Sequence, residues 1–253
     1  MSTARSWEAP NILNIAHRGA SGHAPENTIA AFLEAERLGA DGVELDVMLC
    51  ASGEVVVTHD HELSRLAKAP LRVEDLSFEA LRLLDVGSWF DPKFADERIP
   101  TLQEVFDAIP NLLVNVEIKV ESITSDFRLL CEKVAALVKR QPRERIVVSS
   151  FHPGVLFWYK RLDPTTRLGY LHSSDENVLF RSGLLADVLK PFAMHPGKDL
   201  LSESYVKKAR DKHRKINTWT VNELADIERA KGLGVDGIIS NYPGRVAGVL
   251  GRA

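Results

Sequence analysis

Short runs of apolar residues alternate with helix-period stretches from one end of the chain to the other. The apolar runs lie at residues 12–16, 43–48, 55–58, 112–118, 146–149, 167–171, 191–195, 216–221 and 235–240. Between them, apolar residues recur with helical spacing, as in residues 26–38, 127–140 and 223–231. Strands that alternate with helices in this way indicate an α/β fold with a parallel sheet covered by helices.

One of the nine runs does not fit the alternation. Ser52-Gly53 comes directly before residues 55–58 and is a hairpin signal, so this run pairs with the strand before it. The other runs give eight strand–helix units, and a closed (β/α)8 TIM barrel typically takes about 250 residues. We therefore expect a TIM barrel, with an open doubly wound sheet as the alternative.

A long interval separates His59 from the helix that begins near Thr101. It spans about forty residues, whereas ordinary connections in α/β proteins have roughly 2–6. It carries its own apolar residues, which are Leu63, Leu66, Leu76, Leu81, Leu84, Trp89, Phe90 and Phe94. We expect one catalytic domain over residues 1–253, with a small insertion subdomain at about 60–100 after the hairpin. A long surface loop is the alternative.

Composition and charge exclude several classes of protein. The chain is 45% hydrophobic and 26% charged, which is typical of a globular domain and not of a disordered one. A net charge of −3 argues against a nucleic-acid partner. No run is long enough for a membrane anchor, and residues 1–10 contain no apolar signal core. We expect a cytoplasmic protein in which Cys50 and Cys131 are free thiols.

Acidic residues interrupt two of the predicted strands. Glu44 and Asp46 lie two positions apart in one strand, so they point to the same face. Asn115, Glu117 and Lys119 share a face of the next main strand in the same way. Buried charges are costly unless they are paired or bind a metal, and barrel active sites lie at the carboxyl ends of the strands.

Three further residues follow strands at the same end of the expected barrel, namely His17, His59 and Trp219. Three carboxylates form a hard-oxygen cluster that suits Mg²⁺, Ca²⁺ or Mn²⁺. With Arg18 and Lys119 nearby, the formal charge of the cluster is negative until a divalent cation binds, and only then does it favour an anionic phosphodiester. Two histidines, with ordinary pKa values of about 6.5, can share acid and base roles near neutral pH.

Several motifs now point to a known family by their order and spacing. They are His17-Arg18-Gly19, Pro25-Glu26-Asn27-Thr28, the segment 39–47, Val57-Thr58-His59-Asp60, Ile99-Pro100-Thr101-Leu102, the strand 115–119, Trp219-Thr220-Val221-Asn222 and the segment 234–240. Together they cover nearly the whole chain. In this pattern the chain resembles the glycerophosphodiester phosphodiesterase family, within the phospholipase C-like phosphodiesterase superfamily.

The resemblance implies a (β/α)8 barrel with an insertion, and metal-dependent hydrolysis of a small glycerophosphodiester to glycerol 3-phosphate and an alcohol. Matched residue by residue, it implies roles for eight side chains. Glu44, Asp46 and Glu117 would hold a divalent metal, with Mg²⁺ or Ca²⁺ expected before Mn²⁺; His17 and His59 would be the acid/base pair; Arg18 and Lys119 would contact phosphate; and Trp219 would form part of the substrate wall. The oligomeric state is left open.

The sequence departs from the family pattern at two places, residues 50–53 of the hairpin and Asn241, where an aspartate is common. Neither carries an assigned role, so we expect them to affect local detail and not activity. Asn27 either supports the site or caps the first helix. The remaining histidines, among them His172 and His195, are expected in loops or facing solvent.

Other interpretations of the same residues stay open. The acids could form structural ion pairs with Arg18 and Lys119, and Trp219 could be core packing. His59 and His61 could instead belong to a zinc site, and Trp89-Phe90 could line the substrate entrance or fill the core of the insertion. Alternative functions are a lysophospholipase D-like or sphingolipid-directed phosphodiesterase, and a non-catalytic barrel that binds phosphorylated metabolites.

Overall fold

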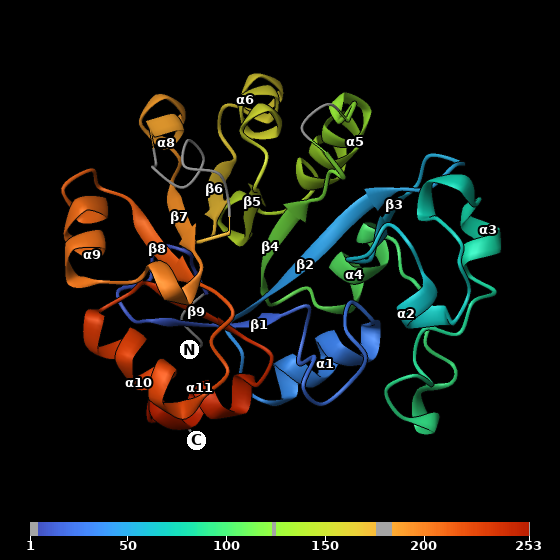
Figure 1. The fold of residues 1–253 in the computed structure, drawn as a ribbon, viewed down its shortest axis with the longest axis horizontal. Coiled ribbons are helices and arrows are strands. Elements are labelled where there is room, and N and C mark those ends of the chain that lie inside the picture. The colour runs from blue at the N-terminus through green and yellow to red at the C-terminus, as the bar shows by residue number, and fades with distance from the viewer. Residues whose placement is uncertain (1–4, 123–124, 176–183, 253) are drawn as a thin grey trace.

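Eight parallel strands close into a barrel surrounded by helices (Figure 1). The structure, a computed structural model, describes residues 5–122, 125–175 and 184–252. The parallel strands are β1 (Leu13–His17), β2 (Gly42–Leu49), β4 (Leu113–Ile118), β5 (Ile146–Ser150), β6 (Arg167–His172), β7 (Ala193–Pro196), β8 (Lys215–Thr218) and β9 (Gly237–Ser240). Pairing of β1 with both β2 and β9 closes the barrel, which confirms the predicted TIM-barrel fold.

The helices follow the strands in alternation. They are α1 (Ile29–Arg37), α4 (Leu102–Ala108), α5 (Arg128–Val138), α6 (Pro153–Leu162), α8 (Leu184–Leu189), α9 (Glu203–Arg210), α10 (Leu224–Leu233) and α11 (Pro243–Val249), with short 3₁₀ turns η3 (Arg143–Arg145) and η4 (Lys198–Leu200). Within the described residues no helix is long and apolar enough to cross a membrane.

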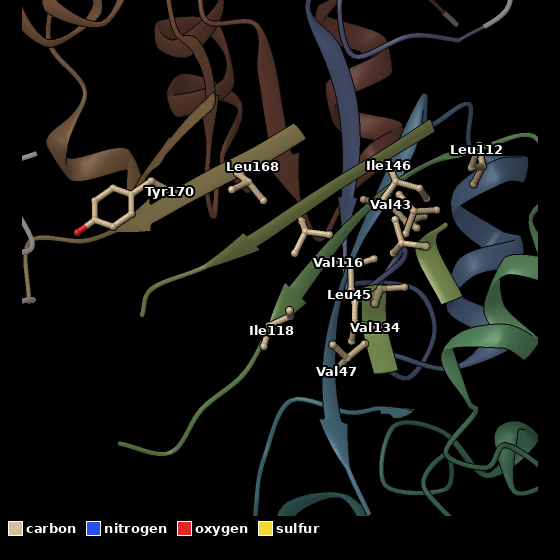
Figure 2. Packing of buried hydrophobic residues seen from close by; sticks show 14 of the residues in the cluster. Val43, Leu45, Val47, Leu112, Val116, Ile118, Val134, Ile146, Leu168 and Tyr170 are labelled. Carbon is tan, nitrogen blue, oxygen red and sulfur yellow. The ribbon is translucent and has the colours of Figure 1, made fainter. Parts of the chain in front are cut away.

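The main core lies between the strands and the helices outside them. Figure 2 shows Val43, Leu45 and Val47 spaced along β2, with Val116 and Ile118 of β4 close by, all in one buried cluster. Because strand side chains alternate between faces, the residues between these valines and leucines face the inside of the barrel. The same alternation that builds the outer core therefore carries the acidic residues of β2 and β4 inward.

The hairpin strand β3 (Val55–Val57) pairs antiparallel with β2, as the Ser52-Gly53 signal predicted. Between β3 and α4 lie α2 (Ser64–Ala67), η1 (Val73–Asp75), α3 (Phe78–Leu81) and η2 (Pro92–Phe94). Figure 1 shows this segment at one side of the barrel, next to β3. We call its separate hydrophobic cluster the insertion core: Met48, Cys50, Val56, Leu63, Leu66, Val73, Leu81, Val86 and Ile99, with Trp89 packed against it.

A tryptophan near the N-terminus belongs to a third hydrophobic cluster, which lies inside the barrel. Trp7 is 2% exposed and packs with Leu13, Leu113 and Val147, residues at the starts of their strands. Its Nε1 atom donates a hydrogen bond to the carbonyl of Arg145. The start of the chain thus helps to fill the end of the barrel opposite the carboxyl ends of the strands. Cys50 and Cys131 are buried free thiols, as expected.

Candidate active site

Three buried carboxylates meet at the carboxyl ends of β2 and β4. Strand register pairs Glu44 with Asn115 and Asp46 with Glu117, so the acids lie side by side inside the barrel. One oxygen of each acid lies within 4.8 Å of the others, and among the described residues these three form the one group of this kind. Burial and the neighbouring carboxylates raise the pKa of Glu44 well above its usual range.

The other two acids, Asp46 and Glu117, lie close to the cationic side chains of Arg18 and Lys119. The Nζ atom of Lys119 lies 3.0 Å from Glu117 and 3.7 Å from Asp46. The Nε atom of Arg18 lies 3.3 Å from Asp46, an ion pair without hydrogen-bond geometry. Burial raises the pKa of Glu117, whereas at Asp46 the charges of Lys119 and Arg18 outweigh burial and lower the pKa.

The chemistry of the cluster fits a divalent cation. Three carboxylates are hard oxygen ligands, and the Oε1 atom of Glu44 is buried with no hydrogen-bond partner. A buried charged oxygen without a partner is costly, and a bound cation would remove that cost. Asn115, directly beside Glu44 in the register, also has both side-chain polar atoms buried and without partners.

Two histidines approach the carboxylates from β1 and from the end of the hairpin. Nδ1 of His17 lies 2.7 Å from Oδ1 of Asn241, and Nδ1 of His59 lies 2.6 Å from Oδ1 of Asp60. Carboxylate and amide oxygens only accept hydrogen bonds, so each Nδ1 carries the hydrogen and each ring keeps Nε2 free for chemistry. Burial and the charge of Arg18 lower the pKa of His17 to about 4.

Seven of the eight predicted residues line one cavity of about 250 Å³. It is lined by His17, Arg18, Glu44, His59, Glu117, Lys119, Phe151, Leu171, Trp219 and Ile239. Asp46 lies directly behind, in contact with both cations. All eight residues proposed from the sequence are thus brought to one end of the barrel.

Two left-handed backbone positions shape the loop after β1. Arg18 has φ 54° and Asn27 has φ 58°, a region that few residues other than glycine adopt. In this conformation the Arg18 amide donates to Glu44 Oε2 at 3.1 Å, and Nδ2 of Asn27 donates to Asp46 Oδ2 at 2.9 Å. Thr28, not Asn27, caps α1. The geometry favours the supporting role for Asn27 over the capping role.

Aromatic side chains form one wall of the cavity. The rings of Trp219 and Phe151 meet edge to face at 5.3 Å, and Phe151 lies 5.9 Å from the Nζ atom of Lys119. The indole Nε1 atom donates to the carbonyl of His195 at 2.8 Å. Sequence reasoning missed Phe151, although its place directly after β5 is the same signal that identified Trp219.

Sequence reasoning also underestimated Asn241, which contacts His17 directly, and did not consider Asp60 as the partner of His59. His61 points elsewhere: its Nδ1 atom lies 2.9 Å from Glu74, and it does not line the cavity. The geometry therefore gives no support to a zinc site built on His59 and His61. Trp89 packs against the insertion core, which favours the core interpretation of that residue.

Two histidines expected in loops or facing solvent are buried instead. His172 is 1% exposed and bonds to the hydroxyl of Tyr205 at 2.9 Å, and His195 is fully buried beside Asn217 at 3.1 Å. The expectation was wrong because each ring lies at the end of a strand whose neighbours cover it. Burial lowers the pKa of His172 to about 4 and that of His195 to about 3.

The fold and the site together define a (β/α)8-barrel enzyme with buried carboxylates, two histidines and two cations around one cavity. The sequence profile of the glycerophosphoryl diester phosphodiesterase family matches residues 17–245, and the chain belongs to that family. This confirms the resemblance seen in the sequence.

Relatives and solved structures agree with this assignment. A glycerophosphodiester phosphodiesterase of Caldanaerobacter subterraneus is 38% identical over 91% of this chain and 94% of its own. A human lysophospholipase D is 29% identical over 94% of this chain and 85% of its own. An Oleispira antarctica phosphodiesterase in complex with the product sn-glycerol-3-phosphate superposes with a TM-score of 0.86, at 28% identity, covering 96% of this chain and 97% of its own.

Proposed function

We propose that this protein hydrolyses glycerophosphodiesters to glycerol 3-phosphate and an alcohol, with His17 and His59 as the acid/base pair. The observation that carries the proposal is the convergence of both histidines, two cations and the carboxylates on one cavity of about 250 Å³. The Oleispira antarctica relative was solved with glycerol 3-phosphate, which supports this product class.

Glu44, Asp46 and Glu117 would hold the divalent metal, and their hard oxygens suit Mg²⁺ or Ca²⁺, with Mn²⁺ as a further candidate. When bound, such a cation supplies positive charge that stabilises the charge developing on the phosphoryl oxygens. It also changes the formal charge of the cluster, with Arg18 and Lys119 included, from negative to positive. The protein part of the site is thus complementary to an anion only in the metal-loaded state.

Arg18 and Lys119 bind and orient the phosphate. Both are partly buried and already lie against carboxylates, which keeps their side chains in place before substrate arrives. A charge that is held in position before the reaction costs little reorganisation during it. Trp219 and Phe151 limit the space beside Lys119, and so help to fix which way the organic part of the substrate points.

The two histidines divide the proton transfers. One imidazole starts neutral and takes the proton from the nucleophile at Nε2, while the other starts protonated on both nitrogens and donates its Nε2 proton to the oxygen of the departing alcohol. The nucleophile is either water or the neighbouring hydroxyl of the glycerol, which would give a cyclic phosphate first. Reaction in ¹⁸O-water, with the products followed over time, distinguishes these two routes.

The decisive experiment is an activity panel of Mg²⁺, Ca²⁺, Mn²⁺ and Zn²⁺ against several glycerophosphodiesters, with EDTA as the control. We expect turnover that EDTA abolishes, and a loss of about 10²–10⁴-fold in kcat for His17→Ala and for His59→Ala. Folded variants that keep full kcat would refute the mechanism.

The 29% identity to a human lysophospholipase D makes that activity the second candidate. Adding lysophosphatidylcholine to the panel beside glycerophosphocholine separates the two candidates. Faster turnover of the lysophospholipid would favour the second. Tight binding of both compounds, measured by calorimetry, with no product formed would instead favour a non-catalytic binding barrel.

A further inference from the structure

Arg65 joins two acidic residues that lie on opposite sides of it. It belongs to α2 of the insertion, outside the barrel proper. Its Nε atom donates to Asp60 Oδ2 at 2.8 Å, while its two terminal nitrogens donate to both oxygens of Glu26 at 2.9 and 2.7 Å. One guanidinium therefore makes a single contact to one carboxylate and a bidentate contact to the other.

Each of these two acids contacts a residue that lines the cavity. Asp60 uses its other oxygen, Oδ1, to accept from Nδ1 of His59 at 2.6 Å. Glu26 accepts from Nη1 of Arg18 at 2.9 Å. A continuous chain of charged hydrogen bonds thus runs from His59 through Asp60, Arg65 and Glu26 to Arg18.

We propose that Arg65 is a positioning residue, through which the insertion holds His59 in the orientation and tautomer that the reaction needs. The proposal rests on the function proposed above. Asp60 has one oxygen on the imidazole and one on the guanidinium, so Arg65 restricts rotation of the carboxylate about its own bond. A carboxylate held in this way keeps the hydrogen of His59 on Nδ1 and presents Nε2 to the cavity.

The side chain and its surroundings suit this role. A guanidinium is planar and offers its donors in a fixed fork, so it can serve two carboxylates at once, whereas an ammonium is a point charge. The ring of Trp89 lies 5.5 Å from the guanidinium carbon, a cation–π distance. Leu66, the next residue of α2, is 4% exposed in the insertion core, which anchors the helix that carries Arg65.

Charge favours the same arrangement. The hydrogen bonds from His59 and Arg65 hold the pKa of Asp60 well below its usual range, so this carboxylate stays an acceptor throughout the pH range of an assay. Arg65 is 43% exposed, but its partners Glu26 and Asp60 are only 11% and 25% exposed, so its loss leaves two largely buried carboxylates with fewer partners. Arg65→Met should therefore lower stability as well as catalysis, and the positioning role is tested by kcat of the folded variant.

The chain offers a control in Arg82. It also lies in the insertion, is 40% exposed, pairs with Glu104 of α4 and has a guanidinium carbon 5.7 Å from the ring of Phe78. It does not line the cavity. Arg82→Met also removes an ion pair between the insertion and the barrel, a longer one of 3.4 Å to a carboxylate that is 43% exposed, and only Arg65 is linked to a histidine of the site.

We expect Arg65→Met to lower kcat by about 10- to 100-fold. This is the usual effect of losing a residue that orients an active-site side chain through a hydrogen bond. KM should change less than about threefold, since Arg18 keeps its contact with Glu26, and Arg82→Met should match wild type. In an Asp60→Asn background, which itself lowers kcat by about 10²-fold or more, adding Arg65→Met should have less than a further threefold effect.

Three results would overturn the proposal: kcat of Arg65→Met equal to that of Arg82→Met, a loss confined to KM, or the full loss repeated in Asp60→Asn. If wild type turns over no glycerophosphodiester, the proposed function fails, and ¹⁵N NMR of the imidazoles tests the positioning role alone. The His59 signals, assigned with His59→Gln, should show the Nδ1–H tautomer in wild type and a mixture in Arg65→Met. The same tautomer in both would refute the role.

Discussion

Glu44→Gln should make the metal-free protein more stable while it removes metal binding. Glu44, Asp46 and Glu117 each place an oxygen within 4.8 Å of the others. At that separation and an effective dielectric constant of about 20, two like charges repel by about 3 kcal/mol. The attraction of Glu44 to Arg18 offsets part of this repulsion. We therefore expect Glu44→Gln to raise the free energy of unfolding of the metal-free protein by about 2 kcal/mol.

The direction of the pH dependence follows from the raised pKa of Glu44. In the unfolded chain the group ionises near pH 4.3. The folded protein must either bear the repulsion or keep a proton on Glu44 as the pH rises, so the contribution of this one group to stability falls on going from pH 5 to pH 8. A glutamine at position 44 neither repels the other carboxylates nor has to keep a proton. The stability of Glu44→Gln relative to wild type should therefore be greater at pH 8 than at pH 5.

Thermal unfolding in EDTA, with and without added Mg²⁺, measures both effects. For a chain of this size, 2 kcal/mol corresponds to a rise in Tm of about 4–8 °C. Metal at 100 times its Kd should stabilise wild type by about 2.7 kcal/mol and the variant much less. Asp163→Asn is the control, since that buried carboxylate accepts bonds from Thr165 and Thr166 and should lower Tm when neutralised. A lower Tm for Glu44→Gln in EDTA at pH 8 would refute the reasoning.

Three other predictions concern residues around the site and the core. Asn27→Ala removes the donor to Asp46 and should weaken Mg²⁺ binding by about 10- to 100-fold in calorimetry, and an unchanged Kd would contradict its supporting role. Trp7→Ala should destabilise the protein to urea by about 3–5 kcal/mol with kcat unchanged, because it empties the barrel end remote from the site. His172 and His195 have folded pKa values of about 4 and 3, so the unfolded chain binds protons at these residues first as the pH falls. Each should therefore lower the free energy of unfolding by about 2 kcal/mol between pH 7 and pH 5. In urea unfolding, His195→Gln should lose less stability than wild type over this range, and an equal loss would show that the ring does not contribute.

The fold was predictable because its signal is local. Each apolar run needs only its own residues to be recognised, and the run 43–48 differs from β2, Gly42–Leu49, by one residue at each end. The period of two in that run also placed Glu44 and Asp46 on the inner face. The same alternation placed Lys119 on the face of Glu117, and strand ends supplied His17, His59 and Trp219. Their roles in catalysis stay predictions until the variants are measured.

Some contacts around the site were not predictable, because they join distant parts of the chain. Asn241 is 224 positions from His17, and Arg65 is 39 positions from Glu26. No periodicity links such pairs, and only the closed barrel brings the first pair together. His195 failed for a related reason, since no sequence pattern linked it to a partner and the tertiary packing of β6, β7 and β8 decided its burial.

Residues that were predictable and residues that were not differ in where they lie in the site. Strand residues supply the acids. Val43, Leu45 and Val47 of β2 pack outside the barrel, so the acids between them point inward, where they repel one another. Loop residues then supply hydrogen-bond donors that offset this repulsion. The side chain of Asn27 donates to Asp46, and the backbone amide of Arg18 donates to Glu44. Such loop residues adopt a strained backbone or reach across the sequence, so their contribution depends on the assembled site. Substitutions at the supporting positions should therefore lower activity more sharply than they lower stability.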